Sequence, residues 1–277
     1  MSLRVNFAGF SSKKVSGRWH NQDGPPALRD GGYRAIAPDQ IGFGKSSKPA
    51  YYHFTLQQLA TNTRDLLRAA GVARAHVLGH SMGGMVATRF ALMFPDMTAS
   101  LTLMNPLGLE DWQALGVPYT PVDAVYRQEL DKTAEKIRAY QLENYYDGKW
   151  RPAYDPWVEQ LASFNRSPDY PRMAWNQALT SDMIFTQPVV HEFGALRMPV
   201  LLLIGQRDRT AIGRASAPSD LRPKLGNYPA LGRAARRAIP NSELVEFEGI
   251  GHMPHIEAFE TFIVAYRAFL ERQPAGH

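Results

Sequence analysis

The segment Ala75–Val86, AHVLGHSMGGMV, constrains the fold of this chain more than any other. An apolar run ends at Gly79, Ser81 follows two residues later, and two glycines come before apolar residues resume. If the run is a strand and Met82 begins a helix, Ser81 occupies a tight turn in which only very small neighbours fit. The pattern therefore predicts a Ser81 hydroxyl exposed at the carboxyl edge of a sheet. It also predicts that the Met82 amide, at a helix N-terminus, faces an oxyanion forming there.

Short apolar runs alternate with helical patterns along most of the chain. The run VLLLI contains no polar residue, which favours a strand covered by helices on both faces. Thr55 and Gln58 form a capping box ahead of an apolar stripe that Gly71 ends. The alternation predicts a mostly parallel, doubly wound α/β sheet. The expected strands are Arg34–Asp39, His76–Leu78, Leu101–Asn105, Val200–Ile204 and Leu244–Phe247, and the expected helices begin near Leu56, Met82 and Phe259.

The alternation stops between about Leu107 and Val189. This stretch is rich in aromatic residues and proline and holds one helical pattern, from Tyr126 to Gln141. We interpret residues 107–188 as a helical cap inserted between the two parts of a core, residues 1–106 and 189–277. An aromatic cap would present a largely apolar pocket, although each aromatic side chain could equally fill an ordinary core.

The motif G-x-S-x-G and several other stretches carry a resemblance to a known family. GHSMGG resembles the nucleophile elbow of the α/β-hydrolase family. GYRAIAPDQIGFGKSSKP, MNPLGLEDW, LLLIGQRD and GHMP are similar to sequences of members described broadly as hydrolases or acyltransferases. The resemblance extends from about Gly32 to Phe269. It implies an α/β-hydrolase fold with a helical cap and a Ser-His-Asp catalytic triad.

A serine hydroxyl is a poor nucleophile until a base removes its proton, and the base needs a carboxylate to orient it. In the family that this chain resembles, the acid and then the histidine follow the serine, each on a loop after a later strand. Asp208 comes directly after VLLLI, and His252 follows the LVEF run. The resemblance therefore implies a triad of Ser81, Asp208 and His252.

Other residues could fill these roles. Asp39 precedes the serine, and Asp220 lies too far beyond its strand, so Asp208 is the preferred acid. His255 could form a metal pair with His252, but no third group of ligands accompanies them. We expect no metal site, and we expect His80 to point away from the substrate.

The N-terminus departs from the family pattern. Members normally carry further strands and an HG motif ahead of this region, and an N–H after that motif completes the oxyanion hole. Here a short segment without an HG pair precedes GGYR, and RVNFAGF resembles the part that follows the motif. The N-terminal strands are therefore expected to be incomplete. The amide of Val5 or Asn6 is the expected second oxyanion donor, beside Met82.

Several classes of function are disfavoured. DQIGFGKSS lacks the first glycine of a phosphate loop, and no G-x-G-x-x-G follows a strand, so we expect no cofactor. The net charge of +5 owes much to Arg207–Arg237, where basic residues are spread out without interleaved aromatics. This composition favours a solvated basic face over a nucleic-acid site. The absence of cysteine, of a signal-like start and of a long apolar run predicts a cytoplasmic protein that does not bind membranes.

The first functional hypothesis is a serine esterase that cleaves a small, mostly apolar ester through an acyl-enzyme intermediate. The same triad would also serve C–C bond hydrolysis, amide cleavage or acyl transfer. Serine at the elbow argues against dehalogenases and epoxide hydrolases, which need a carboxylate there. A catalytically degenerate, ligand-binding protein on the same scaffold is the alternative from another class. The expected partner is a small-molecule substrate, and the oligomeric state is not predicted.

Overall fold

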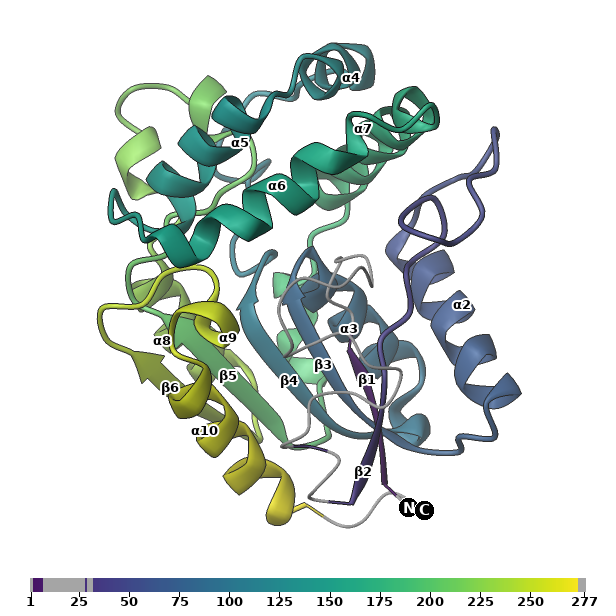
Figure 1. Ribbon diagram of the computed structural model, residues 1–277. Helices are drawn as coiled ribbons and strands as arrows, with labels where there is room; N and C mark the ends of the chain where they lie inside the picture. Colours follow the sequence, from purple (N-terminus) through teal and green to yellow (C-terminus); the bar gives the residue numbers. More distant parts are fainter. Residues whose placement is uncertain (1, 7–27, 29–31, 274–277) are drawn as a thin grey trace.

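The computed structural model describes residues 2–6, 28 and 32–273. They form a six-stranded, wholly parallel sheet in the order β2-β1-β3-β4-β5-β6. Helices cover both faces of the sheet, and a further layer of helices lies beyond the carboxyl ends of β3 and β4 (Figure 1). The strands are β1 (Ser2–Asn6), β2 (Tyr33–Ile36), β3 (Ala75–Ser81), β4 (Thr98–Pro106), β5 (Val200–Gly205) and β6 (Ser242–Phe247).

The helices fall into two groups. Those that flank the sheet are α2 (Leu56–Ala69), α3 (Met82–Met93), α8 (Tyr228–Ala238) and α10 (Phe259–Glu271), with the short α9 (Pro254–Glu257) before the last. Those of the outer layer are α4 (Val122–Leu130), α5 (Ala134–Tyr140), a π-helix (Gln141–Tyr145), α6 (Asp155–Phe164) and α7 (Tyr170–Thr186). Short 3₁₀ turns lie at Pro95–Met97, Pro152–Tyr154, Val190–Ala195, Arg214–Ser216 and Arg222–Lys224.

The core lies on both faces of the sheet, as the unbroken apolar run of β5 predicts. Leu202 and Ile204 pack into the cluster that contains α2, α3 and α8. Leu201 and Leu203 point the other way, toward α10. All four are essentially inaccessible to solvent, and burial of each such side chain contributes about 1.5–3 kcal/mol. The doubly wound sheet expected from the sequence is thus confirmed.

Three local predictions need correction. The Thr55 hydroxyl accepts the Gln58 amide at 3.0 Å, but the Gln58 side chain bonds Asn62 instead of closing the capping box. The single helical pattern from Tyr126 to Gln141 is two helices, because Thr133 caps the start of α5. Strand β1 and helix α8 were not expected at all.

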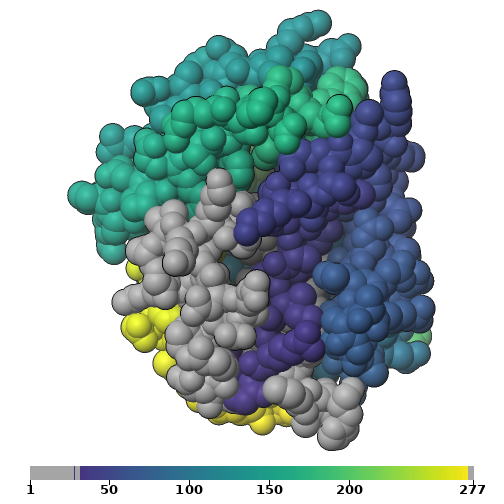
Figure 2. Space-filling model, turned by 45° about the vertical axis from the view of Figure 1, so that its right-hand side comes forward, coloured from purple at the N-terminus to yellow at the C-terminus, as the bar shows by residue number. Residues whose placement is uncertain are grey.

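The outer layer is the chain between β4 and β5, and it rests on the loop that follows β2 (Figure 2). Asn176 of α7, which is buried, donates to the Gly42 carbonyl at 3.0 Å. At the end of α7, Gln187 accepts the Leu56 amide at 2.8 Å. These contacts tie α7 to the sheet domain at two points. The limits proposed for the cap, residues 107–188, stay a prediction. Across the described ranges, every helix is too short or too polar to cross a bilayer.

Candidate active site

Ser81 is the last residue of β3 and directly precedes α3. Its φ of 54° and ψ of −127° are angles that non-glycine residues rarely adopt, which indicates a strained turn. A Cβ atom on Gly79 would lie 2.3 Å from the Gly83 carbonyl oxygen, and one on Gly84 would lie 2.3 Å from the Pro106 side chain. Glycine is therefore needed at both positions for the strand, the turn and the helix to pack this closely.

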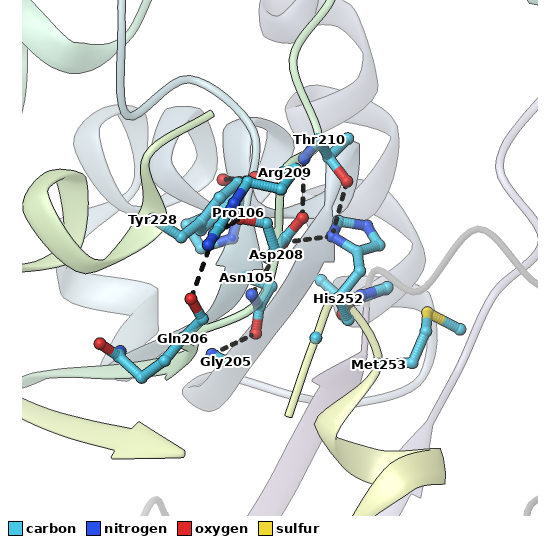
Figure 3. Close-up of polar contacts among 12 residues, drawn as sticks. Asn105, Pro106, Gly205, Gln206, Asp208, Arg209, Thr210, Tyr228, His252 and Met253 are labelled. Atoms are coloured by element: carbon cyan, nitrogen blue, oxygen red, sulfur yellow. Dashed lines mark hydrogen bonds and ion pairs between the residues drawn. The ribbon is translucent and has the colours of Figure 1, made fainter. Parts of the chain in front are cut away.

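Asp208 and His252 form a buried pair on the loops that follow β5 and β6 (Figure 3). Nδ1 of His252 donates to Oδ2 of Asp208 at 2.6 Å, and both side chains are fully inaccessible to solvent. With the proton on Nδ1, Nε2 carries the free lone pair. Nε2 is buried and has no hydrogen-bond partner among the described residues. An imidazole held in this way has an unused basic nitrogen.

Two further groups fix the Asp208 carboxylate, and sequence reasoning missed both. Asn105, at the end of β4, donates from Nδ2 to Oδ2 of Asp208 at 2.8 Å and accepts the Gly205 amide at 3.0 Å. The Thr210 amide donates to Oδ1 of Asp208 at 2.8 Å. The carboxylate thus receives three hydrogen bonds, counting that from His252. Asn105 is the polar last residue of the predicted strand Leu101–Asn105, and that position was the available signal.

Ser81 and His252 come from neighbouring parts of the fold but share no hydrogen bond in this structure. The link between their segments is His80, which immediately precedes Ser81. Its Nε2 donates to the His252 carbonyl oxygen at 2.8 Å, and the two imidazole rings have centroids 4.7 Å apart. His80 is buried. That it points away from the substrate stays a prediction.

The two proposed oxyanion donors are placed very differently. Met82 is the first residue of α3, so its amide is one of the N-terminal donors of that helix. Val5 instead lies inside β1, level with Val77, four residues before Ser81. At a rise of about 3.3 Å per residue, the level of Val5 in the sheet lies about 13 Å from the turn at Ser81. The structure does not bring Val5 to Met82, because Ser2–Asn6 forms a strand rather than a loop.

The rival residues lie elsewhere. The Asp39 carboxylate accepts the Lys45 amide at 2.9 Å, which closes the turn after β2, and Asp220 is exposed. His255 stands behind the pair, beside the His80 ring at a centroid distance of 5.0 Å. Burial, and secondarily the charge of His252, lowers the pKa of His255 to about 3. Burial, followed by the charges of His252 and His255, places the pKa of His80 well below its ordinary value.

The basic segment is not uniformly solvated. Arg207 is largely buried: its Nε donates to the Gly249 carbonyl at 2.6 Å, and Nη2 pairs with Glu257 at 3.3 Å. Glu257 in turn accepts the Gly251 and Met253 amides at 3.0 and 3.2 Å. Arg207 therefore holds the Asp208 loop against the His252 loop, and the expectation of a solvated basic face is wrong at this residue.

A cleft of about 440 Å³ opens beside α4 and α7, against the loop that follows β2. Its lining contains none of the residues of the pair or of the elbow, so it does not define an acyl pocket. The lining residues are Ala50, Tyr126, Pro168, Asp169, Pro171, Arg172 and Trp175.

Comparisons with known proteins agree with this architecture. A family model described as the alpha/beta hydrolase fold matches residues 7–259. A probable hydrolytic enzyme from Pseudomonas aeruginosa PAO1 superposes with a TM-score of 0.88 at 52% identity, covering 97% of this chain and 83% of that one. Lipase 1 of Psychrobacter immobilis is 26% identical over 244 residues, which is 86% of this chain and 69% of the lipase. The 2-hydroxymuconate semialdehyde hydrolase of Pseudomonas putida is 27% identical over 251 residues, 88% of this chain and 79% of that enzyme.

The family match spans most of the chain, and the parallel sheet with helices on both faces agrees with it. The chain belongs to the α/β-hydrolase fold family.

Proposed function

We propose that this protein is a serine hydrolase that cleaves a small, mostly apolar carboxylic ester through an acyl-enzyme intermediate. The observation that carries the proposal is the buried Asp208–His252 pair, with a hydrogen bond of 2.6 Å at Nδ1 and a basic Nε2 without a partner among the described residues. A buried, oriented imidazole of this kind is what a serine nucleophile requires. The lipase among the relatives supports ester chemistry.

The reaction follows the two halves of acyl transfer. His252 Nε2 removes the proton from the Ser81 hydroxyl as its oxygen attacks the ester carbonyl, and the Met82 amide donates to the oxyanion. Collapse of the tetrahedral intermediate breaks the bond to the alcohol, which leaves with the proton from Nε2. Water, deprotonated by Nε2, then attacks the acyl group on Ser81. The bond to the Ser81 oxygen breaks, the acid is released, and the proton on Nε2 returns to the Ser81 hydroxyl. Asp208 stabilises the imidazolium in each half.

C–C bond hydrolysis is the second candidate, and the relative that acts on 2-hydroxymuconate semialdehyde favours it. The nucleophile, base and acid keep their roles, but the leaving group is a carbanion that must be protonated at carbon. Acyl transfer differs only in the group that attacks the acyl-enzyme. A ligand-binding protein without turnover is the remaining alternative.

The test is turnover of p-nitrophenyl esters of increasing acyl length and of 2-hydroxymuconate semialdehyde. The variants are Ser81→Ala and Asp208→Asn, with the exposed Asp220→Asn as the matched control. We expect ester turnover to fall by about 10⁴-fold or more in the first two variants and to stay unchanged in the third. Turnover of 2-hydroxymuconate semialdehyde without turnover of any ester would favour the second candidate. Undiminished ester turnover in Ser81→Ala would refute the proposal.

A further inference from the structure

We propose that Tyr145, on the π-helix of the outer layer, is a positioning residue for His252. Its backbone fixes the loop that carries the base, and its ring stabilises the imidazolium that forms when the base takes a proton. The inference rests on the proposed function and deepens it, because it makes the cap part of the catalytic machinery rather than only a cover.

The first observation is a set of hydrogen bonds that backbone carbonyls of the π-helix and of the residue after it accept from the two catalytic loops. The Tyr145 carbonyl accepts the His252 amide at 2.8 Å. The carbonyls of Asn144 and Tyr146 accept the Arg209 amide at 3.0 Å and Arg207 Nη1 at 2.8 Å. Three consecutive cap residues thus hold the residues on either side of Asp208 and His252 itself. A π-helix turns its carbonyls out of the α-helical pattern, and such turns are frequent at functional sites.

The second observation is the close approach at Gly251, the residue before His252. A Cβ atom at this position would lie 1.7 Å from the Tyr145 carbonyl oxygen, far inside any allowed contact. Glycine at 251 is therefore required for the cap to reach the loop of the base. The sequence places its smallest residue where this contact needs it.

The third observation is the position of the Tyr145 ring. It stacks on the His252 imidazole with centroids 4.3 Å apart and an interplanar angle of 30°. Asp208 binds the edge of the same imidazole, at Nδ1. The His252 imidazole is therefore bonded at its edge by the Asp208 carboxylate and covered on one face by the Tyr145 ring. A ring face carries partial negative charge, so it favours the imidazolium over the neutral imidazole.

The ring acts on an imidazole that other titratable groups also face. They are Asp208 after β5, His80 on β3, Tyr228 on α8, and His255 and Glu257 on α9. Tyr228 also interacts with the Tyr145 hydroxyl, which Tyr145→Leu and Tyr145→Phe both lack. A difference between these two variants therefore reports on the stacked ring.

The experiment compares Tyr145→Leu with Tyr145→Phe. Leucine covers the imidazole with apolar atoms but has no ring face, whereas phenylalanine keeps the face and loses only the hydroxyl. In Tyr145→Leu we expect kcat to fall about tenfold with KM little changed, and the acid limb of kcat/KM to move about half to one unit lower in pH. Tyr145→Phe should stay within about twofold of the native protein. A residue that served only the fold would reduce the fraction of active protein and leave the limb in place.

Active sites are counted by fluorophosphonate titration, so kcat refers to folded protein only. If Tyr145→Leu does not fold, Tyr145→Met, whose flexible side chain fills the same space, replaces it with the same expectation. An acid limb that is unmoved in the leucine or methionine variant overturns the inference. So does a phenylalanine variant as impaired as the leucine one. Failure of the proposed function is recognised separately, because the native protein would then show no turnover that depends on Ser81.

Discussion

Replacement of Asn105 tests whether the site is held as the structure indicates. The side chain is fully buried, and it bonds both Oδ2 of Asp208 at 2.8 Å and the Gly205 amide at 3.0 Å. In Asn105→Leu a charged hydrogen bond worth about 1.5–3 kcal/mol is lost, and a buried N–H loses its acceptor at about 1–3 kcal/mol. The backbone at 105 has a φ of 38°, where leucine is less favourable than asparagine by about 1 kcal/mol. The free energy of unfolding should therefore fall by about 3.5–7 kcal/mol.

The assay is urea denaturation, read together with kcat on an ester that the native protein turns over. We expect kcat to fall by at least about tenfold, because Asp208 loses one of the bonds that fix it. In the matched Asn105→Asp variant, the Gly205 amide keeps an oxygen acceptor, but a second carboxyl group lies beside Asp208. Repulsion raises the pKa of the introduced carboxyl in the folded state, so its stabilising proton is lost as pH rises. The stability deficit of this variant should therefore grow as pH rises from about 4, the ordinary pKa of an unfolded aspartate, through the raised pKa of the folded state. A loss below about 1 kcal/mol in Asn105→Leu, with unchanged kcat, would refute the reasoning.

Three further predictions concern a buried histidine, a close approach of two backbone segments and the strained turn at Ser81. His255 has a folded pKa of about 3, below its ordinary value, so the unfolded chain binds a proton that the native state does not. Stability should fall as pH drops below about 6.5, by about 2 kcal/mol at pH 5, and urea midpoints for His255→Gln should show correspondingly less acid sensitivity. A Cβ on Gly205 would lie 1.9 Å from the Gly251 carbonyl oxygen, so Gly205→Ala should lose at least about 3 kcal/mol and most of its activity; near-native thermal unfolding would contradict this. Ser81→Gly should be more stable than Ser81→Ala by about 1 kcal/mol, because glycine tolerates the φ of 54°, and equal melting temperatures would argue against strain at the turn.

The sheet and the elbow could be predicted because their signals are local. The apolar run at 200–204 favours a strand buried on both faces, and it is one. The glycines around Ser81 predict a close approach of strand and helix. The structure shows this approach between Gly79 and the Gly83 carbonyl. Asp208 and His252 follow their strands immediately, so placing them at one sheet edge required only the parallel order.

The remaining features depend on contacts between distant parts of the chain. Asn105 and Asp208 are far apart in sequence. An asparagine at the end of a strand does not indicate which carboxylate it will bind. Tyr145 lies in a stretch of many aromatic residues, and only the π-helix turns its carbonyl and ring toward His252. Arg207 lies in a basic segment that the sequence predicts to be exposed to solvent. Its acidic partner, Glu257, comes from a later element, so the pattern around Arg207 does not show the pair. By resemblance Val5 is expected to be an oxyanion donor, whereas the structure places it inside β1, away from the turn at Ser81.

The central claim is that His252, oriented by Asp208, makes the hydroxyl of Ser81 nucleophilic. The most direct measurement is peptide mapping by mass spectrometry after treatment of the native protein with a fluorophosphonate. We expect a single stoichiometric adduct on Ser81, and labelling that is slowed by orders of magnitude in His252→Ala while the fold is unchanged. An adduct on another residue, or labelling of Ser81 at the native rate without the imidazole, would contradict it.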